Sequence, residues 1–228
     1  MFGKSKKKDD NALVEDERKN EHTALKPNRT FYIVPHTGFT KVIQILDLTS
    51  LIKSSYPSEA FDNEAKEIAT SSPPEPWLTV TRQPRWYSKN FVIEQPGSGE
   101  LGQWKAGMFS SSPNTLLFPQ DSPHSSHPIT IKADNAWKFR EQFVKDSRPY
   151  IWTVDNVMSS RKFTLYKVLG GAKQEIGRYE QGWGVKYGGT LVLDANEIDA
   201  VVAVVSVVNI LRKKRQKVAE YSGQAGGG

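Results

Sequence analysis

Apolar and polar residues alternate in a series of short runs from Trp77 onward. Within each run the apolar side chains recur at every second position, which is the period of a β-strand with one buried face. The runs include Phe91 and Ile93, Ile129 and Ile131, Tyr150 to Val154, Phe163 to Lys167, Trp183 to Tyr187, and Thr190 to Leu193. Turn residues separate them at Pro96-Gly97, Asp121-Ser122-Pro123, Asp134-Asn135, Gly170-Gly171 and Gly188-Gly189. This pattern predicts an antiparallel meander that folds into a sandwich or a barrel.

The last apolar segment has a different pattern. Residues 200–211 read AVVAVVSVVNIL, in which ten of twelve positions are apolar, too few for a transmembrane helix of about twenty residues. The valines favour a strand, but Asp194 and Glu197 have the spacing of a capping box, and Arg212–Arg215 would suit a helix C-terminus. We therefore predict a helix over about residues 196–211. Because it is apolar on every face, it must also be buried on every face.

The N-terminal part of the chain gives weaker signals. Residues 1–30 are polar and rich in charge, which predicts a disordered tail, and structure is expected to begin at Phe31. The mixed period of Val42–Lys53 fits a strand and a short helix equally well. Ser-rich and Pro-rich clusters in residues 54–76 predict a long surface connection. The expected organisation is a tail over residues 1–30, one domain over 31–211, and a basic, glycine-ending tail over 212–228.

A family resemblance rests on four segments of the second half. They are Arg148-Pro149-Tyr150-Ile151-Trp152, Leu165-Tyr166, Ile176-Gly177-Arg178-Tyr179 and the apolar stretch Ile198–Leu211. Together they resemble an uncharacterised fungal family that belongs with the tubby C-terminal, phospholipid-scramblase and LURP-one-like barrels. The resemblance implies a closed antiparallel β-barrel of about twelve strands around a central hydrophobic C-terminal helix. It covers residues 130–215 well and residues 30–130 loosely.

The resemblance carries over no functional residue. Scramblases have a cysteine cluster for acylation and an acidic calcium segment, whereas this chain has no cysteine and matches no such segment. Tubby proteins bind phosphoinositide headgroups through basic barrel residues, and those residues cannot be placed on this sequence. The resemblance therefore implies a fold rather than an activity.

Charge is concentrated at the two ends of the chain. Lys and Arg number 31 against 25 Asp and Glu, a net charge of +6. Residues 1–30 hold eight basic and six acidic residues (+2), residues 31–211 hold 18 of each, and residues 212–228 hold five basic and one acidic (+4). A nucleic-acid-binding domain should carry a basic face on the fold itself, so the neutral body argues against that class.

Composition and the N-terminal segment also limit the cellular compartment in which the protein is expected. The absence of cysteine excludes a disulfide scaffold, a Cys-ligated metal site and an S-acyl anchor. The N-terminal segment lacks the apolar core of a secretory signal, and Phe2 excludes N-myristoylation. We expect an intracellular protein that is cytoplasmic and peripheral to a membrane, with the nucleus as the alternative.

No motif supports catalysis or cofactor binding. Gly97–Gly102 matches G-x-G-x-x-G, but no helical period follows it and no H-R-D or D-F-G motif occurs, so it predicts a glycine-rich hairpin connection. Asp121, His124 and His127 are spaced like metal ligands, yet the Ser and Pro around them predict a solvated loop, and His36 suits a turn. Four histidines without cysteine or G-x-S-x-G assemble no nucleophilic triad. We predict no enzyme, no cofactor and no metal.

Two further patterns have a functional and a structural interpretation. Asp199, Ser206 and Asn209 fall near one stripe of the predicted helix and could line a ligand cavity. Back-bonding of Ser206 to the i−4 carbonyl and contact of Asn209 with a strand explain them more simply. Trp86–Lys89 and Trp137–Arg140 mix aromatic and basic residues as in single-strand binding, but the same alternation places aromatics inward and charges outward in a barrel wall.

The leading hypothesis is a non-enzymatic interaction module that weakly binds an anionic membrane surface or a protein partner. The candidate lipid-headgroup residues are Lys4, Lys6, Lys7, Lys8, Arg212, Lys213, Lys214, Arg215 and Lys217. The last five should leave the helix end unburied and contribute about 1 kcal/mol each near an anionic leaflet. A match to the helix dipole with a solubilising tail explains them equally well. The alternative is a nuclear-targeted regulatory or scaffold protein that uses the basic tails as import signals. A lipid carrier or an enzyme would need a cavity beside the helix.

Overall fold

The computed structural model of the chain describes residues 25–37, 40–83, 90–135, 140–154, 161–182 and 187–225. Most of the predicted N-terminal tail, residues 1–24, lies outside these ranges. Strand β1 (Arg29–His36) begins two residues before the predicted start at Phe31. The described chain therefore contains nearly the whole of the predicted domain and most of the predicted C-terminal tail.

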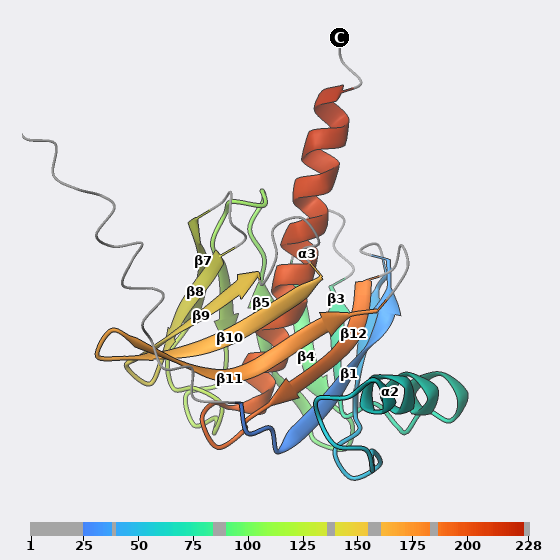
Figure 1. The fold of residues 1–228 in the computed structure, drawn as a ribbon. Coiled ribbons are helices and arrows are strands. Elements are labelled where there is room, and N and C mark those ends of the chain that lie inside the picture. Colours follow the sequence, from blue (N-terminus) through green and yellow to red (C-terminus); the bar gives the residue numbers. More distant parts are fainter. Residues whose placement is uncertain are drawn as a thin grey trace, which may run out of the picture.

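Twelve strands form one closed antiparallel barrel, which confirms the predicted fold class (Figure 1). Each strand pairs with its neighbours in sequence, and β1 pairs with β12 to close the barrel, with Phe31 opposite Leu191. The remaining strands are β2 (Val42–Asp47), β3 (Leu78–Arg82), β4 (Asn90–Gln95), β5 (Gly99–Lys105), β6 (Asn114–Leu117), β7 (Ile129–Asn135), β8 (Arg140–Lys145), β9 (Arg148–Val154), β10 (Lys162–Leu169), β11 (Ala172–Gln181) and β12 (Tyr187–Leu193).

The alternation seen in the sequence separates the inside of the barrel from the outside. Phe91 and Ile93 in β4, and Phe163 and Leu165 in β10, are buried in one continuous core. Successive strand residues point to opposite faces of a sheet, so the intervening positions face outward. The predicted run from Trp183 lies outside the described residues up to Lys186.

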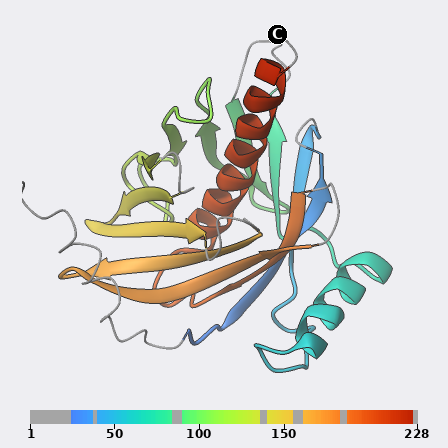
Figure 2. The same cartoon turned by 45° about the horizontal axis from the view of Figure 1, so that its top comes forward.

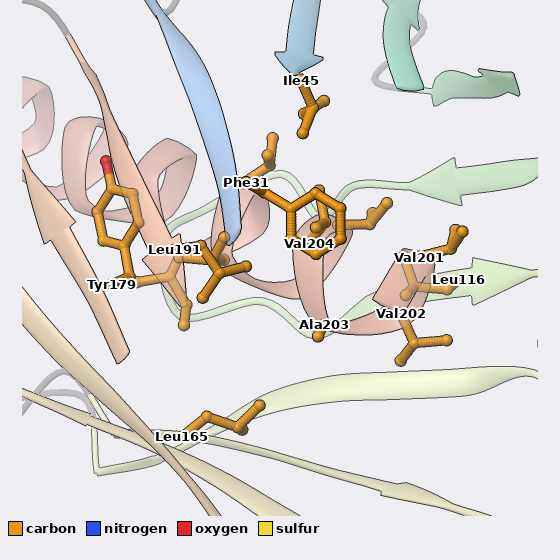
Figure 3. Packing of buried hydrophobic residues seen from close by; sticks show 14 of the residues in the cluster. Phe31, Ile45, Leu116, Leu165, Tyr179, Leu191, Val201, Val202, Ala203 and Val204 are labelled. Carbon is orange, nitrogen blue, oxygen red and sulfur yellow. The ribbon is translucent and has the colours of Figure 1, made fainter. Parts of the chain in front are cut away.

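Helix α3 (Ala200–Ala225) fills the barrel, as predicted for a helix that is apolar on every face (Figures 1 and 2). Every residue from Val201 to Leu211 is at most 3% exposed. Figure 3 places the helix side chains Val201, Val202 and Val204 among Phe31, Leu116, Leu165 and Leu191 of the wall. Burial of the valines inside the barrel outweighs their preference for a strand.

Both predicted ends of this helix are wrong. The N-cap is Asp199, whose Oδ1 accepts a hydrogen bond from Val202 N at 2.9 Å. Asp194 instead closes the preceding turn, where its carbonyl accepts from Glu197 N at 3.1 Å. At the other end the helix continues to Ala225 rather than stopping at Leu211. Arg212–Arg215 therefore lie within the helix, and the dipole interpretation of these residues fails.

The predicted surface connection over residues 54–76 contains a helix, α2 (Glu59–Ser71). Ser58 caps it by accepting from Phe61 N at 3.1 Å. Phe61 and Ala65, four positions apart, are buried. Ala65 belongs to a second small core formed with Tyr32 of β1, Leu46 of β2 and Leu48, which directly follows β2. The Ser and Pro residues at its ends obscured this short apolar period. In Val42–Lys53, the strand is present, and a turn rather than a helix follows it.

The predicted turns give a mixed outcome. Gly97, at φ 82°, lies in the β4–β5 turn as predicted, but residues 99–102 of the G-x-G-x-x-G segment belong to β5 rather than to the connection. Gly188-Gly189 is not a turn but part of β12. A Cβ on Gly188 would lie 2.6 Å from Pro35 Cα, so glycine is needed for close approach of two strands rather than for a change of direction. Asp134-Asn135 likewise ends β7, and His36 ends β1.

We expect Val204→Asp to unfold the barrel. The substitution places a carboxylate at a fully buried position of α3, and burying an unpaired charge costs several kcal/mol of a stability that is typically about 5–15 kcal/mol. The purified variant should be insoluble or lose its near-ultraviolet circular dichroism. Val218→Asp, at an exposed position of the same helix, is the matched control and should melt like the parent. A soluble Val204→Asp protein with unchanged melting would contradict the central position of α3.

Candidate functional site

Helix α3 leaves the barrel at one end, which we call the exit rim. Because neighbouring strands are antiparallel, the odd-numbered strands end and the even-numbered strands begin at this rim. The apolar part of the helix stops at Leu211 and four consecutive basic residues follow, Arg212 to Arg215. An α-helix has 3.6 residues per turn, so four consecutive side chains point in directions that cover the whole circumference.

Each of the four basic residues meets a different part of the barrel wall. The Arg212 guanidinium lies 5.3 Å from the ring centroid of Phe91. Lys213 Nζ donates to Glu141 Oε2 of β8 at 2.8 Å. Lys214 Nζ donates to Gln181 Oε1, at the end of β11, at 3.0 Å. The charge of Arg215 acts on His36, at the end of β1. The helix thus brings one cation to each of four sectors of the rim.

The expectation that these side chains cannot be buried is wrong. Lys213 is only 4% exposed, and its ion pair with Glu141 occupies it. Burial raises the pKa of Glu141, although Lys213 acts in the opposite direction. Arg212, Lys214, Arg215 and Lys217 are half-buried. A long basic side chain can bury its aliphatic stem and keep its charged end near solvent, so these four remain candidates for contact with an anion.

Two strand-end arginines complete a group that we call the basic cluster: Arg82, Arg161, Arg212, Lys214 and Arg215. Arg82 is the last residue of β3, and Arg161 directly precedes β10. Arg161 Nη2 donates to the Gln181 carbonyl at 2.9 Å, while Lys214 binds the side chain of the same glutamine. Basic residues from three segments that are at least 51 positions apart in sequence thereby converge at the rim, and the net charge of each segment did not predict this.

Burial and like charge both act against the protonated forms in this cluster. Burial, and then the charge of Arg82, lower the pKa of Arg212 to about 10. Burial and the charge of Arg161 lower the pKa of Lys214. Burial and the charge of Arg215 lower the pKa of His36 to about 4. A bound anion would relieve this repulsion, so the basic cluster is the candidate functional site.

The polar residues of α3 position the helix rather than form a binding site. Ser206 donates to the Ala203 carbonyl at 2.7 Å and accepts from Trp152 Nε1 at 2.8 Å. Asn209 Oδ1 accepts from the Asn114 side chain at the start of β6. The structural interpretation of this stripe is thus correct, although Ser206 bonds to i−3 rather than i−4. These contacts fix the rotation and depth of the helix.

The structure separates the three residues that were weighed as metal ligands. His124 Nδ1 lies 3.0 Å from Asp199 Oδ2, so it contacts the N-cap of α3. His127 instead contacts Ser126 at the surface, and Asp121 lies in the turn that follows Pro119. Within the part of the chain that the structure describes, no group of three or more His, Cys, Asp or Glu residues could hold a metal ion.

The other predicted contact residues are less informative. Lys4, Lys6, Lys7 and Lys8 lie outside the described residues, as do Trp86–Lys89 and residues 137–139. Arg140, the last residue of the second aromatic and basic run, pairs with Asp134 at 2.9 Å.

A cavity of about 260 Å³ lies between α2 and the outer surface of β10–β12. Its lining includes Lys162 and Arg178, but Lys162 pairs with Glu180 at 2.9 Å and Arg178 with Glu175 at 2.8 Å. Because the chain itself supplies a counter-charge to each of these cations, the cavity does not select a ligand of either sign.

No helix within the described ranges is both long and apolar enough to cross a membrane. Comparison with protein-family models, with curated proteins and with solved structures finds no match to this chain. The resemblance to tubby-like barrels therefore stays a prediction, and the geometry of the exit rim carries the functional argument.

We expect His36 to make stability depend on pH. An unfolded histidine titrates near 6.5 and native His36 near pH 4, so the unfolded state binds more protons between these values. Stability is fully present above about pH 6.5 and should fall by on the order of 2 kcal/mol as pH is lowered to about 4. Chemical denaturation at several pH values measures this slope, and the His36 ring resonances report its pKa directly.

His36→Gln should remove the contribution of His36 to the pH dependence of the unfolding free energy. The control is His127→Gln, at an exposed site outside the exit rim. A native His36 that titrates near 6.5 would show that neither burial nor Arg215 acts on it.

Proposed function

We propose that this protein is a non-enzymatic interaction module that binds an anionic membrane surface through the basic cluster at its exit rim. The observation that carries the proposal is the convergence of Arg82, Arg161, Arg212, Lys214 and Arg215 around the emerging helix. Exposed Lys41 and Lys105 lie on the same rim, at the start of β2 and the end of β5. The cations thus surround the point where the helix leaves the barrel.

Elementary electrostatics sets the strength of this binding. Each basic residue near an anionic leaflet contributes about 1 kcal/mol, and the effect falls off within about 8 Å at physiological ionic strength. Lys213 is paired with Glu141 inside the barrel and Arg212 packs on two aromatic rings, so the contribution of α3 is tested at the half-buried residues Lys214, Arg215 and Lys217. Binding should therefore be weak, reversible and sensitive to salt.

The structure favours this function over the nuclear alternative. An import signal at Arg212–Lys217 would need an accessible basic segment, whereas these residues form one turn and a half of helix with Lys213 buried. A lipid carrier would need a cavity beside α3, and side chains of the wall pack against the helix from Val201 to Leu211. A protein partner with an acidic surface would contact the same cations. Vesicle-binding experiments distinguish this partner from a membrane.

We expect Lys214→Gln/Arg215→Gln/Lys217→Gln to weaken binding to anionic vesicles about tenfold, because three contributions of about 1 kcal/mol are lost and salt screens part of each. The measurement is co-sedimentation with phosphatidylcholine vesicles with and without phosphatidylserine, at low and physiological salt. The parent should bind only the anionic vesicles and bind them less as salt is raised.

The matched control is Lys53→Gln/Lys66→Gln/Lys132→Gln, which removes the same charge from exposed positions away from the rim. Thermal melting of both triple variants checks their fold first. Equal partitioning of the two variants would mean that net charge, not the exit rim, attracts the protein to the vesicles, and a parent that binds no anionic vesicle at low salt would end the proposal.

A further inference from the structure

The loop between β5 and β6, residues 106–113, presents two large apolar side chains to solvent at the exit rim. Met108 is 67% exposed and Phe109 is 60% exposed, the two highest values among the large hydrophobic residues of the described ranges. Leaving such side chains in water is unfavourable by about 25 cal/mol per Å² of apolar surface. Two adjacent residues of this kind on one loop therefore call for a functional explanation.

Hydrogen bonds hold this loop beside the emerging helix. Ser110 donates to the Glu220 carboxylate of α3 twice, from its backbone nitrogen at 3.0 Å and from its hydroxyl at 2.6 Å. Phe109 N donates to Ser112 Oγ at 3.2 Å, and Gly107 N donates to the Asn114 side chain at the base of the loop. The position of Met108 and Phe109 is thus fixed relative to the basic residues of α3.

Two of the five other exposed large hydrophobic residues of the described ranges lie at the same end of the barrel. Val42 begins β2 at the exit rim, and Val218 lies on α3 one turn beyond Lys214. Apolar groups and cations are therefore presented together in the direction in which the helix leaves the barrel. This combination is typical of proteins that lie in a membrane interface, where apolar residues enter the acyl boundary and cations stay at the headgroups.

We propose that Met108 and Phe109 insert into the interfacial region of an anionic bilayer while the basic cluster lies at the headgroups. This inference rests on the proposed function and adds the part of the chain that enters the membrane. Apolar insertion and electrostatic attraction need each other. Each buried CH₂ adds about 0.8 kcal/mol, but a single weak membrane signal gives only marginal binding, whereas two together give stable binding.

The shape of this surface favours a bilayer over a protein partner. Protein interfaces typically have an apolar centre surrounded by a polar margin, packed against a complementary surface. Helix α3 extends beyond the barrel (Figures 1 and 2). The apolar pair lies on a loop that is hydrogen-bonded to this helix, and the cations lie where the helix leaves the barrel. A fluid layer of lipid can surround such a protruding loop without a preformed groove.

The absence of cysteine makes a direct test of insertion available. A single cysteine at Phe109→Cys carries an environment-sensitive fluorophore, and Leu169→Cys, an exposed apolar site at the opposite end of the barrel, is the control. With phosphatidylserine-containing vesicles the label at 109 should shift to the blue and be quenched by quenchers attached to the lipid acyl chains. The label at 169 should change in neither respect.

Loss of the apolar pair gives a second, independent readout. Met108→Ser/Phe109→Ser should lower partitioning onto anionic vesicles about tenfold at physiological salt, with Val144→Ser/Leu169→Ser as the matched control. All four sites are exposed, so the variants should melt like the parent.

The outcomes separate this inference from the proposed function. If the parent binds vesicles but the label at position 109 stays in water, insertion is overturned and binding through the basic cluster remains. A parent that does not bind anionic vesicles even at low salt would overturn both, and a label that shifts with an acidic protein but not with vesicles would replace the bilayer by a protein partner.

Discussion

The requirement to cover every face of helix α3 explains why this barrel is closed. Residues 201–211 are apolar around the whole circumference except at Ser206 and Asn209, and all of them are buried. A sheet on one side would leave half of the valine side chains in water, whereas a closed sheet removes all of them from solvent. The two polar residues bind Trp152 and Asn114 of the wall, and these contacts set how the helix is rotated within it.

The change from apolar to basic residues at Leu211 and Arg212 marks the depth at which the barrel ends. Since the helix continues without interruption, the next four side chains necessarily face all sectors of the rim. Part of this charge serves the structure, because Lys213 pairs with Glu141 and Arg212 packs on Phe91 and Trp104. From the wall, the charge of Arg82 acts on Arg212 and the charge of Arg161 acts on Lys214. This local excess of positive charge coexists with a domain that is neutral as a whole.

Sequence periodicity predicted strands β4, β7, β9, β10 and β12 and the central helix, because burial on one face or on all faces leaves a direct pattern in the residues. Periodicity failed where the role of a residue depends on segments of the chain that are distant in sequence. Gly188-Gly189 looks like a turn until the approach of Pro35 is known. Arg82 and Arg161 lie 79 residues apart, and only strand pairing places both at the rim. The four consecutive basic residues did carry a usable signal, because a continuing helix would have pointed them in all directions, but the predicted helix end at Leu211 concealed it.

Closure of the barrel also determines how this protein can meet other molecules. In an open sheet, the outer strands expose unpaired backbone donors and acceptors that attract extended peptides or further copies of the chain. Here β1 pairs with β12, and every strand has two neighbours. Among its described strands, the native barrel therefore has no free edge to which a peptide strand could be added or along which two barrels could aggregate. Specificity must reside in side chains at the two ends of the barrel and on its outer wall, where substitutions can alter binding without altering the backbone pairing that maintains the fold.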